Sequence, residues 1–296
     1  MAAEPPSKRR KPAVLVGLED GSTTLENYPK VTVRQLDAVR GTYVVTDPMN
    51  DHFDYSIGNS LWSASLELID YLVRSGDEGG LVQRAVEVGA GCGAAGISLW
   101  GRGSCNVVIT DLHEMLPIMR INCSYNLEKA QAAASRGSLS AMALDWTDPS
   151  SATAVYDAHG PFDVVVGAEV SYDDDLHAAL VDTLAILCGM SRTSEGAVAE
   201  APAAVPGRSG TTQARVLLAI PQRDNDWEVL DLCERRGFSV TQVMLSPPDH
   251  EHSSPVGIFE LVPSSRAPVA VSSCSPAFAT AAAGSKHRED STLHTE

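Results

Sequence analysis

The sequence AVEVGAGCG at residues 85–93, followed by NVVITD at residues 106–111, decides the fold of this chain. Each stretch contains a short apolar strand; the first runs into a glycine turn, and the second ends in Asp111. Glycine lacks a Cβ atom, so a backbone that contains it can turn tightly and lie close to a ligand. An acid about twenty residues beyond such a turn, at the end of the next strand, can accept hydrogen bonds from a ribose. The pattern therefore indicates a nucleoside-bearing cofactor at the carboxyl edge of a parallel sheet.

Around these two stretches, strand and helix patterns alternate along the chain. Residues 61–73 carry apolar side chains at the spacing of a helix with one buried stripe, and Trp62 falls on that stripe. Strands that alternate with helices imply a doubly wound parallel sheet of the α/β class. The strands are expected near 84–88, 106–111, 139–144, 162–168 and 215–221, and the helices near 94–100, 113–127, 174–188 and 226–236.

Two short β pairs flank this alternation. Residues 31–33 and 42–46, separated by Gly41, predict a small antiparallel pair ahead of the main sheet. Residues 238–245 and 256–262 predict two further strands joined by a proline-containing loop and no helix, so we expect them to pair antiparallel. A parallel sheet that ends in an antiparallel pair is not the usual dinucleotide-binding arrangement, which favours a cofactor other than NAD.

Both ends of the chain and one internal segment lack apolar periodicity. Residues 1–25 are expected to form a disordered tail, basic and rich in proline, and residues 263–296 a second disordered tail. Residues 189–214 mix serine, glycine, alanine and proline, so we expect a low-complexity loop insertion there. One domain at residues 26–262 remains, long enough to bury one sizeable core.

Charge and hydropathy restrict the class of protein. The chain has 38 acidic and 22 basic residues and a formal net charge of −16. This charge argues against a general nucleic-acid binder, because binding phosphates needs a basic surface. It is compatible with a basic substrate, and solubility alone explains it equally well. We expect neither a membrane span nor a secretory leader, since no apolar run has the required length.

The cysteines and histidines show no pattern of a disulfide framework or a metal site. The six cysteines contain no CxxC pair, and several lie in apolar segments, so we expect reduced thiols in an intracellular, cytoplasmic protein. The stretch KRRK at residues 8–11 fits a nuclear address and a solvated basic tail equally well. His250 and His252 flank Glu251, but without a cysteine or a helical histidine pair we expect no metal there.

Four segments, in chain order, resemble motifs of the seven-β-strand methyltransferases that use S-adenosylmethionine. More narrowly, they resemble methyltransferase family 16, the protein lysine methyltransferases that include the methyltransferase-like family 21 group. The resemblance runs from about Gly58 to Val262 and implies a seven-stranded, mostly parallel Rossmann-like sheet. The segments are LWSASLEL at 61–68, EVGAGCG at 87–93, residues 110–127 with TDL and paired asparagines, and LDW at 144–146 with VGAEVSY at 166–172.

The resemblance implies S-adenosyl-L-methionine as the cofactor and assigns the turn that would hold it. Gly89, Ala90 and Gly91 should line the turn beside the methionine part. Glu87 should support that turn or face the amino group of the cofactor. Asp111 should hold the ribose hydroxyls, although a cap on the next helix also explains an acid at this position.

Three further residues complete the implied cofactor site. Trp146 should lie against the adenine, where stacking on an aromatic face is worth about 1–3 kcal/mol. Trp62 should cover the cofactor, and core packing is the alternative explanation for this tryptophan. Ala168 should lie where the fourth strand of the sheet meets the nucleoside.

Glu169 and Tyr172 are the expected catalytic residues. Glu169 ends an apolar strand at the cofactor's edge of the sheet, where an acid would bind the cationic head of a lysine and orient its nitrogen. Tyr172 adds a ring face for a cation–π contact and a phenol for hydrogen bonding. The family usually has Asp where this chain has Glu169, which is one methylene longer. A cap for the helix that opens at Asp173 is the alternative explanation for Glu169.

The resemblance implies an S-adenosylmethionine-dependent N-methyltransferase that methylates lysine on a non-histone protein, such as a chaperone or a translation factor, and acts as a monomer. The first alternative keeps the fold but methylates arginine, histidine or a small amine. The second is a non-catalytic module for protein interaction. A nicotinamide-dinucleotide oxidoreductase would reuse the glycine turn and Asp111, but it leaves the terminal strand pair and Trp146 unexplained.

Overall fold

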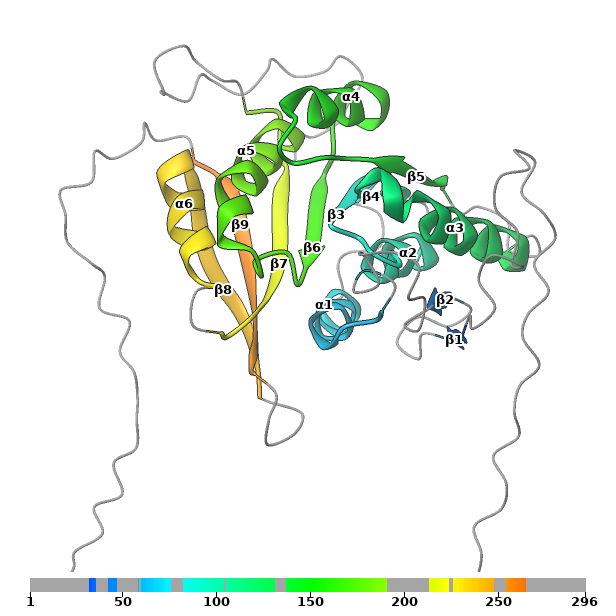
Figure 1. The fold of residues 1–296 in the computed structure, drawn as a ribbon. Coiled ribbons are helices and arrows are strands. Elements are labelled where there is room, and N and C mark those ends of the chain that lie inside the picture. The colour runs from blue at the N-terminus through cyan, green and yellow to red at the C-terminus, as the bar shows by residue number, and fades with distance from the viewer. Residues whose placement is uncertain are drawn as a thin grey trace, which may run out of the picture.

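The computed structural model describes residues 32–35, 42–46, 58, 60–75, 82–103, 105–130, 137–190, 213–223, 226–247 and 254–264. Short 3-10 turns at His113–Met115 and Asp174–Leu176 precede α3 and α5. The elements in chain order (Figure 1) are β1 (Thr32–Gln35), β2 (Tyr43–Thr46), α1 (Ser63–Arg74), β3 (Arg84–Val88), α2 (Ala94–Gly101), β4 (Asn106–Asp111), α3 (Leu116–Ala130), β5 (Leu139–Ala143), α4 (Pro149–His159), β6 (Val164–Ala168), α5 (His177–Leu187), β7 (Arg215–Pro221), α6 (Glu228–Arg236), β8 (Phe238–Ser246) and β9 (Val256–Pro263).

The main sheet has seven strands in the order β5-β4-β3-β6-β7-β9-β8. The strands from β5 to β7 pair in parallel, whereas β9 pairs antiparallel with both β7 and β8. The chain builds β3, β4 and β5 outward in one direction and then returns to place β6 on the other side of β3. Ligands bind at such a reversal, outside the carboxyl ends of the strands. The predicted mostly parallel α/β sheet with a C-terminal antiparallel pair is confirmed.

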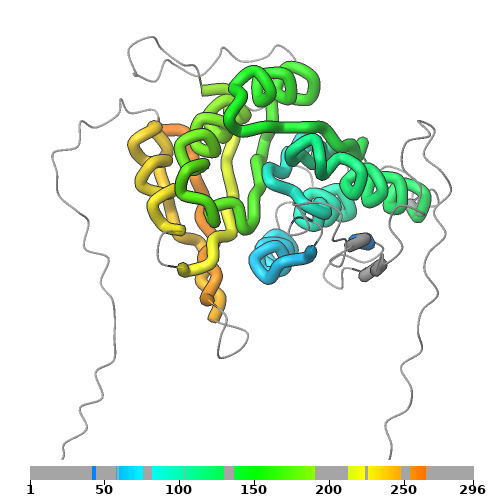
Figure 2. The backbone as a smooth tube through the Cα atoms, in the orientation of Figure 1, coloured from blue at the N-terminus to red at the C-terminus, as the bar shows by residue number. Residues whose placement is uncertain are grey.

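Helices cover both faces of this sheet. Helices α1, α2 and α3 lie on one face and α4, α5 and α6 on the other, and Figure 2 follows the chain from α3 through β5 to α4 as it changes face. Successive residues of a strand point to opposite faces, so Ala85 packs with the first helix layer and Val86 with the second. The central strands therefore contribute alternate residues to two apolar clusters, one on each face of the sheet.

The small antiparallel pair β1–β2, which the sequence predicts, is joined to α3 by one buried side chain. Asn126 Oδ1 accepts a hydrogen bond from the backbone N–H of Tyr43 at 2.8 Å. Its Nδ2 donates to the carbonyl oxygens of Tyr43 at 2.7 Å and of Asn122 at 2.8 Å. The amide thus pairs with Tyr43 as a neighbouring strand would, which gives the paired asparagines a structural role.

Helix α4 was not expected from the sequence. Asp148 caps it by accepting a hydrogen bond from the backbone N–H of Ser150 at 2.9 Å, and Pro149 occupies its first turn. Both residues are typical helix-start signals. The helix was missed because its apolar stripe is short: only Ala152 and Val155 are buried.

Several expectations fall partly or wholly outside the described residues. The two predicted tails and the predicted insertion lie almost entirely outside the described residues; they are residues 1–25, 263–296 and 189–214. Within the described residues, each helix is too short or too polar to cross a lipid bilayer.

The outermost strand β8 is irregular. Its pairing with β9 shifts register between Gln242 and Met244, which marks a β-bulge. Ser239, Thr241 and Gln242 are exposed on this strand. The bulge bends β8 locally and increases its twist.

Replacing Asn126 by Ala should loosen the β1–β2 pair, because the backbone N–H and C=O of Tyr43 lose their partner. Leaving buried polar groups unsatisfied costs about 1–3 kcal/mol each. Hydrogen exchange of the Tyr43 amide should become faster than in the wild type. Leu127→Ala, at an exposed position of the same helix, is the control and should leave that exchange unchanged. Slow exchange in Asn126→Ala would show that other contacts hold the pair.

Candidate active site

The carboxyl ends of β3, β4 and β6 meet at the strand-order reversal. β3 pairs with β6 so that Val88 lies opposite Gly167, which brings Gly89 and Ala168 next to each other. The register of β3 with β4 places Asp111 level with Gly89. Ala168 is 8% exposed. The strand pairing therefore brings Gly89, Asp111 and Ala168 together at the crevice that forms outside the carboxyl ends of parallel strands where their order reverses.

The turn after β3 has a backbone conformation that glycine adopts readily. Gly89 and Gly91 have φ angles of 56° and 54°. A Cβ atom at Gly91 would lie 2.5 Å from the carbonyl oxygen of Gly58. A Cβ atom at Gly89 would lie 2.7 Å from Val170 and 3.1 Å from the Trp146 ring. Neither glycine therefore has room for a side chain, because Gly58, Val170 and Trp146 pack directly against the main chain of the turn.

Asp111 ties this turn to the second strand. One carboxylate oxygen accepts a hydrogen bond from the Gly91 N–H and the other from the Leu112 N–H, each at 2.7 Å. The Ala90 N–H donates to the Thr110 carbonyl at 3.0 Å. Burial raises the pKa of Asp111, and the two backbone hydrogen bonds oppose this shift. Because each carboxylate oxygen has about two acceptor sites, Asp111 retains capacity for ribose hydroxyls. The next 3-10 turn has no side-chain cap, so the cap alternative is wrong.

Glu87 supports the helix that follows the turn. Its side chain is buried, and its carboxylate accepts hydrogen bonds from the backbone N–H groups of Ala95 at 3.3 Å and Gly96 at 2.7 Å. Burial raises the pKa of Glu87 to about 8, while these two hydrogen bonds lower it. Of the two roles implied for Glu87, these contacts match support of the turn.

The two tryptophans have different surroundings. Trp146 is half-buried, and its ring lies beside Gly89. Trp62 is 43% exposed and immediately precedes α1. The prediction that Trp62 belongs to the buried stripe of the helix is therefore wrong. Helix α1 begins one residue after Trp62, at Ser63. Its role over the cofactor stays a prediction. The buried residues of α1 are Ala64, Leu68, Ile69 and Leu72.

Glu169, directly after β6, has a strained backbone. Its φ angle is 57°, and it is the one described residue other than glycine with a positive φ. Such a conformation costs about 1–3 kcal/mol and persists only where the surroundings impose it. The Glu169 N–H donates to the Ala219 carbonyl at 3.1 Å, which fixes the residue against β7. Strain of this kind is concentrated at functional sites.

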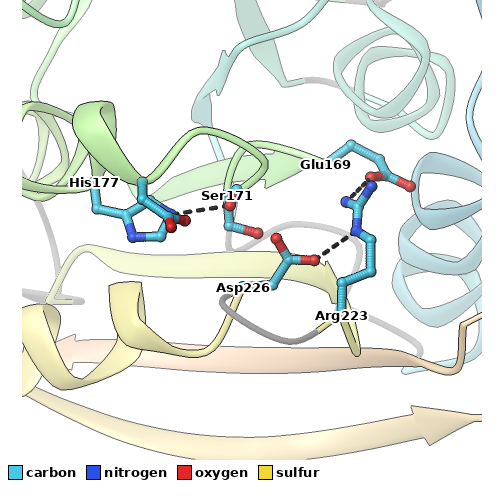
Figure 3. Close-up of polar contacts among 6 residues, drawn as sticks. Glu169, Ser171, His177, Arg223 and Asp226 are labelled. Atoms are coloured by element: carbon cyan, nitrogen blue, oxygen red, sulfur yellow. Dashed lines mark hydrogen bonds and ion pairs between the residues drawn. The ribbon is translucent and has the colours of Figure 1, made fainter.

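An ion-pair cluster includes the Glu169 side chain (Figure 3). Arg223 Nη2 donates to Glu169 Oε2 at 2.6 Å, and Arg223 Nε donates to Asp226 Oδ2 at 2.7 Å. Burial raises the pKa of Glu169, and the Arg223 guanidinium opposes this shift. The sequence analysis singled out neither Arg223 nor Asp226. The sequence hint that could have identified them was their position. Arg223 closely follows the carboxyl end of β7, the strand that pairs with β6.

Tyr172 is 64% exposed on the loop after β6. The next residue, Asp173, caps the following 3-10 turn with its own side chain, which accepts a hydrogen bond from the Asp175 N–H at 3.1 Å. The alternative explanation of Glu169 as the cap of this helix is therefore wrong. A carboxylate and an exposed aromatic ring thus lie close together in sequence at the carboxyl end of β6.

Two further residues shape the site without having been predicted. Buried His177 has its Nε2 atom 2.9 Å from the Ser171 carbonyl oxygen and so fixes the backbone beside Tyr172 (Figure 3). Gly58 lies over Gly91. Neither residue carries a sequence signal, because each acts through a neighbour that only folding brings close.

Among the described residues, no group of three or more His, Cys, Asp or Glu side chains could hold a metal ion. His250 and His252 lie outside the described residues. Burial raises the pKa of the Cys92 thiol to about 12, so this thiol is protonated and packs as a small core residue. The described cysteines, all free thiols, are Cys92, Cys105, Cys123, Cys188 and Cys233.

The chain is similar in sequence to known methyltransferases. A family model described as lysine methyltransferase matches residues 47–199, just over half of the 296 residues. Methyltransferase-like protein 22 of Mus musculus is 30% identical over an alignment of 206 residues, and the match covers 62% of this chain and 47% of that protein. The chain thus spans about half the length of this relative.

Solved structures with a similar arrangement are also named as transferases. A protein from Streptococcus mutans named as an S-adenosylmethionine-dependent methyltransferase is 12% identical, with a TM-score of 0.49 over 79% of this chain and 56% of that chain. A protein from Pyrococcus horikoshii named as a transferase is 14% identical, with a TM-score of 0.46 over 80% of this chain and 73% of that chain. Because both scores are low, the fold rests on the sheet order described above.

Glu87→Gln should flatten the pH dependence of the free energy of unfolding. Folded Glu87 keeps its proton up to about pH 8, whereas the ordinary pKa is 4.5. The folded state therefore binds more protons between these values, and stability falls as the pH rises through this window. One such group contributes at most about 1.4 kcal/mol per pH unit. Urea unfolding at several pH values from about 5 to about 8 measures this slope.

The matched control is Glu128→Gln, at an exposed position of α3, which should keep the slope of the wild type. If Glu87→Gln also kept that slope, burial would not be suppressing the ionisation of Glu87.

Proposed function

The chain belongs to the lysine methyltransferase family, and from this premise we propose that it transfers a methyl group from S-adenosylmethionine to a lysine side chain of another protein. S-adenosylmethionine is the cofactor, and the sheet has the Rossmann-like order of methyltransferases. The lysine acceptor follows from the description of the family together with the chemistry of the crevice.

One observation carries the proposal. Glu169 holds a carboxylate, in a strained conformation, at the same sheet edge as the glycine turn. Its side chain is only 14% exposed. A largely covered carboxylate is a binding group for a cation, and the head of a lysine is a cation at neutral pH. The strain is then explained by the need to aim this acid at the acceptor.

The residues around the turn fit the cofactor. S-adenosylmethionine supplies an electrophilic methyl group on a positively charged sulfur. Gly89 and Gly91 would receive the methionine part against the main chain. Asp111 would accept hydrogen bonds from the ribose, while Trp146 and Trp62 would cover the adenine side. Ala90 and Ala168 are small enough to line the same crevice.

The acceptor nitrogen must lose its proton before it can attack. With an ordinary lysine pKa near 10.4, the neutral amine costs roughly 4–5 kcal/mol at neutral pH. Neighbouring positive charge and a dry crevice both favour the neutral amine. The task of the protein is therefore mainly to position the nitrogen in line with the methyl group, which supplies a large part of the rate. Glu169 would orient the head group, and the Tyr172 ring would contact the cation or the carbon chain.

We further propose that the acceptor is a non-histone protein, of the chaperone or translation-factor type, and that the enzyme acts as a monomer in the cytoplasm. The free thiols of the described cysteines support a reducing compartment. The exposed ring of Tyr172 supports an acceptor that docks from outside the crevice.

A second candidate keeps the cofactor but methylates a nitrogen that is neutral, such as that of histidine. The specific observation in its favour is the ion pair of Glu169 with Arg223 at 2.6 Å, which partly neutralises the carboxylate. Amino-acid analysis of the methylated product separates the two candidates.

Asp111→Ala should weaken the binding of S-adenosylmethionine by about tenfold or more, because a hydrogen bond to a charged group is worth about 1.5–3 kcal/mol. Isothermal calorimetry measures the dissociation constant. Asp157→Ala, an exposed acid on α4, is the control with wild-type affinity. Unchanged affinity in Asp111→Ala would exclude the ribose role. Absence of binding by the wild type would instead favour the non-catalytic module.

Glu169→Gln should lower methyl transfer to protein lysine at least about 100-fold, the scale of a misplaced acceptor, with nearly unchanged affinity for S-adenosylmethionine. Purified enzyme, labelled S-adenosylmethionine and a cell lysate measure the transfer, and hydrolysis identifies methyllysine. Label that enters only small metabolites would overturn the protein acceptor. If cofactor affinity and turnover fell equally, Glu169 would belong to the cofactor-binding residues and not to the acceptor site.

A further inference from the structure

Two carboxylates share one guanidinium beside the proposed acceptor position (Figure 3). Arg223 donates from Nη2 to Glu169 at 2.6 Å and from Nε to Asp226 at 2.7 Å. The side chains of Glu169 and Asp226 are 14% and 6% exposed, whereas Arg223 is 45% exposed. Bonds from two different nitrogen atoms fix the plane of the guanidinium, which a lysine ammonium would not do.

The sheet brings these residues together. β6 pairs in parallel with β7, with Ala168 opposite Ala219. The segment after β7, which carries Arg223 and Asp226, is therefore the neighbour of the segment after β6, which carries Glu169. The pairing makes Arg223 part of the carboxyl edge at which the crevice lies.

The cluster of Glu169, Arg223 and Asp226 holds two acids and one base, so ionised it has one negative charge left over. Among the described residues, hydrogen bonds reach the Glu169 carboxylate only through Oε2. Within that part of the chain, the second oxygen, Oε1, keeps its acceptor sites for an external donor. A single protonated amine would neutralise the cluster.

We propose that Arg223 is a positioning residue for the methyl acceptor: held by Asp226, it fixes Oε2 of Glu169 and so directs Oε1 to the nitrogen of the incoming lysine. The inference rests on the proposed function, and it assigns roles to two residues that the family resemblance left without any. Asp226 serves as the anchor that stops a half-exposed arginine from turning into solvent, where a lone surface ion pair would contribute little.

The charge state of Glu169 supports the same assignment. Burial raises the pKa of Glu169, Arg223 lowers it, and Asp226 raises it. These two residues are the charged groups of the described chain that act on this carboxyl. Without the guanidinium, Glu169 would hold a proton more readily, and a neutral acid binds a cation poorly.

The test compares Arg223→Gln, Arg223→Lys and Asp226→Asn with the wild type. Arg223→Gln should raise the KM for a lysine-bearing acceptor protein about tenfold, the loss of one charge-assisted hydrogen bond, and leave the affinity for S-adenosylmethionine unchanged. The acidic limb of the pH–rate profile should move to higher pH. Carbon-13 NMR of the Glu169 carboxyl, which needs no turnover, should show titration at higher pH.

In Arg223→Lys, Glu169 should titrate as in the wild type because the positive charge is kept. The KM should lie between those of the wild type and Arg223→Gln, because lysine lacks the planar guanidinium. Asp226→Asn should raise the KM less than Arg223→Gln. Arg236→Gln is the matched control: it breaks the Arg236–Asp182 ion pair, 2.9 Å long, between α6 and α5, and should change neither KM nor the titration.

Three results would overturn the inference. A lower KM in Arg223→Gln would mean that the guanidinium competes with the acceptor instead of positioning it. If the wild-type enzyme methylated lysine but Arg223→Gln left the titration of Glu169 unchanged, the inference would be wrong and the proposed function would stand. If the wild-type enzyme methylated no lysine, both the proposed function and the role of Arg223 in positioning the acceptor would be wrong.

Discussion

The hydrogen bond from the Gly91 amide to the Asp111 carboxylate, 2.7 Å long, is the contact on which the site depends. It joins the turn after β3 to the end of β4 and so holds a left-handed backbone in place. Without a Cβ on either side, the turn can lie against Gly58 and Trp146. The strand-order reversal then brings the end of β6 to the same crevice. One carboxylate thereby serves as a structural clamp and as the predicted partner of a ribose, and neither use excludes the other, because an ionised acid has about four acceptor sites.

The crevice collects acids whose protonation is shifted in the same direction. Burial raises the pKa of Glu87, Asp111 and Glu169 alike, so folding works against their ionisation. Groups perturbed in this way are concentrated at functional sites. A bound cation near these acids would oppose the shift, because positive charge favours the ionised form of a carboxyl group. Arg223 supplies such a charge beside Glu169 and lowers the pKa of that carboxyl.

Local sequence patterns predicted most of the fold, apart from helix α4 and the start of α1, whereas contacts between residues far apart in the chain were not predicted. The strand positions, the glycine turn and Asp111 were predicted because each depends on its own few residues. Helix α4 was missed because a short apolar stripe outweighed its good start signals at Asp148 and Pro149. Trp62 was assigned to a buried stripe because periodicity does not show where a helix begins. Arg223 was missed because its partner Glu169 is 54 residues away in the chain, and only the pairing of β6 with β7 brings them together.

The irregular outer strand β8 has a consequence for the behaviour of the protein in concentrated solution. A straight strand at the rim of a sheet offers its unpaired backbone groups to the sheet of a second molecule, which is a route to aggregation. In β8 the bulge between Gln242 and Met244 interrupts such a template, and the exposed Ser239 and Thr241 make the part of the strand before the bulge polar. The strand that completes the sheet therefore also opposes its extension from one copy to the next.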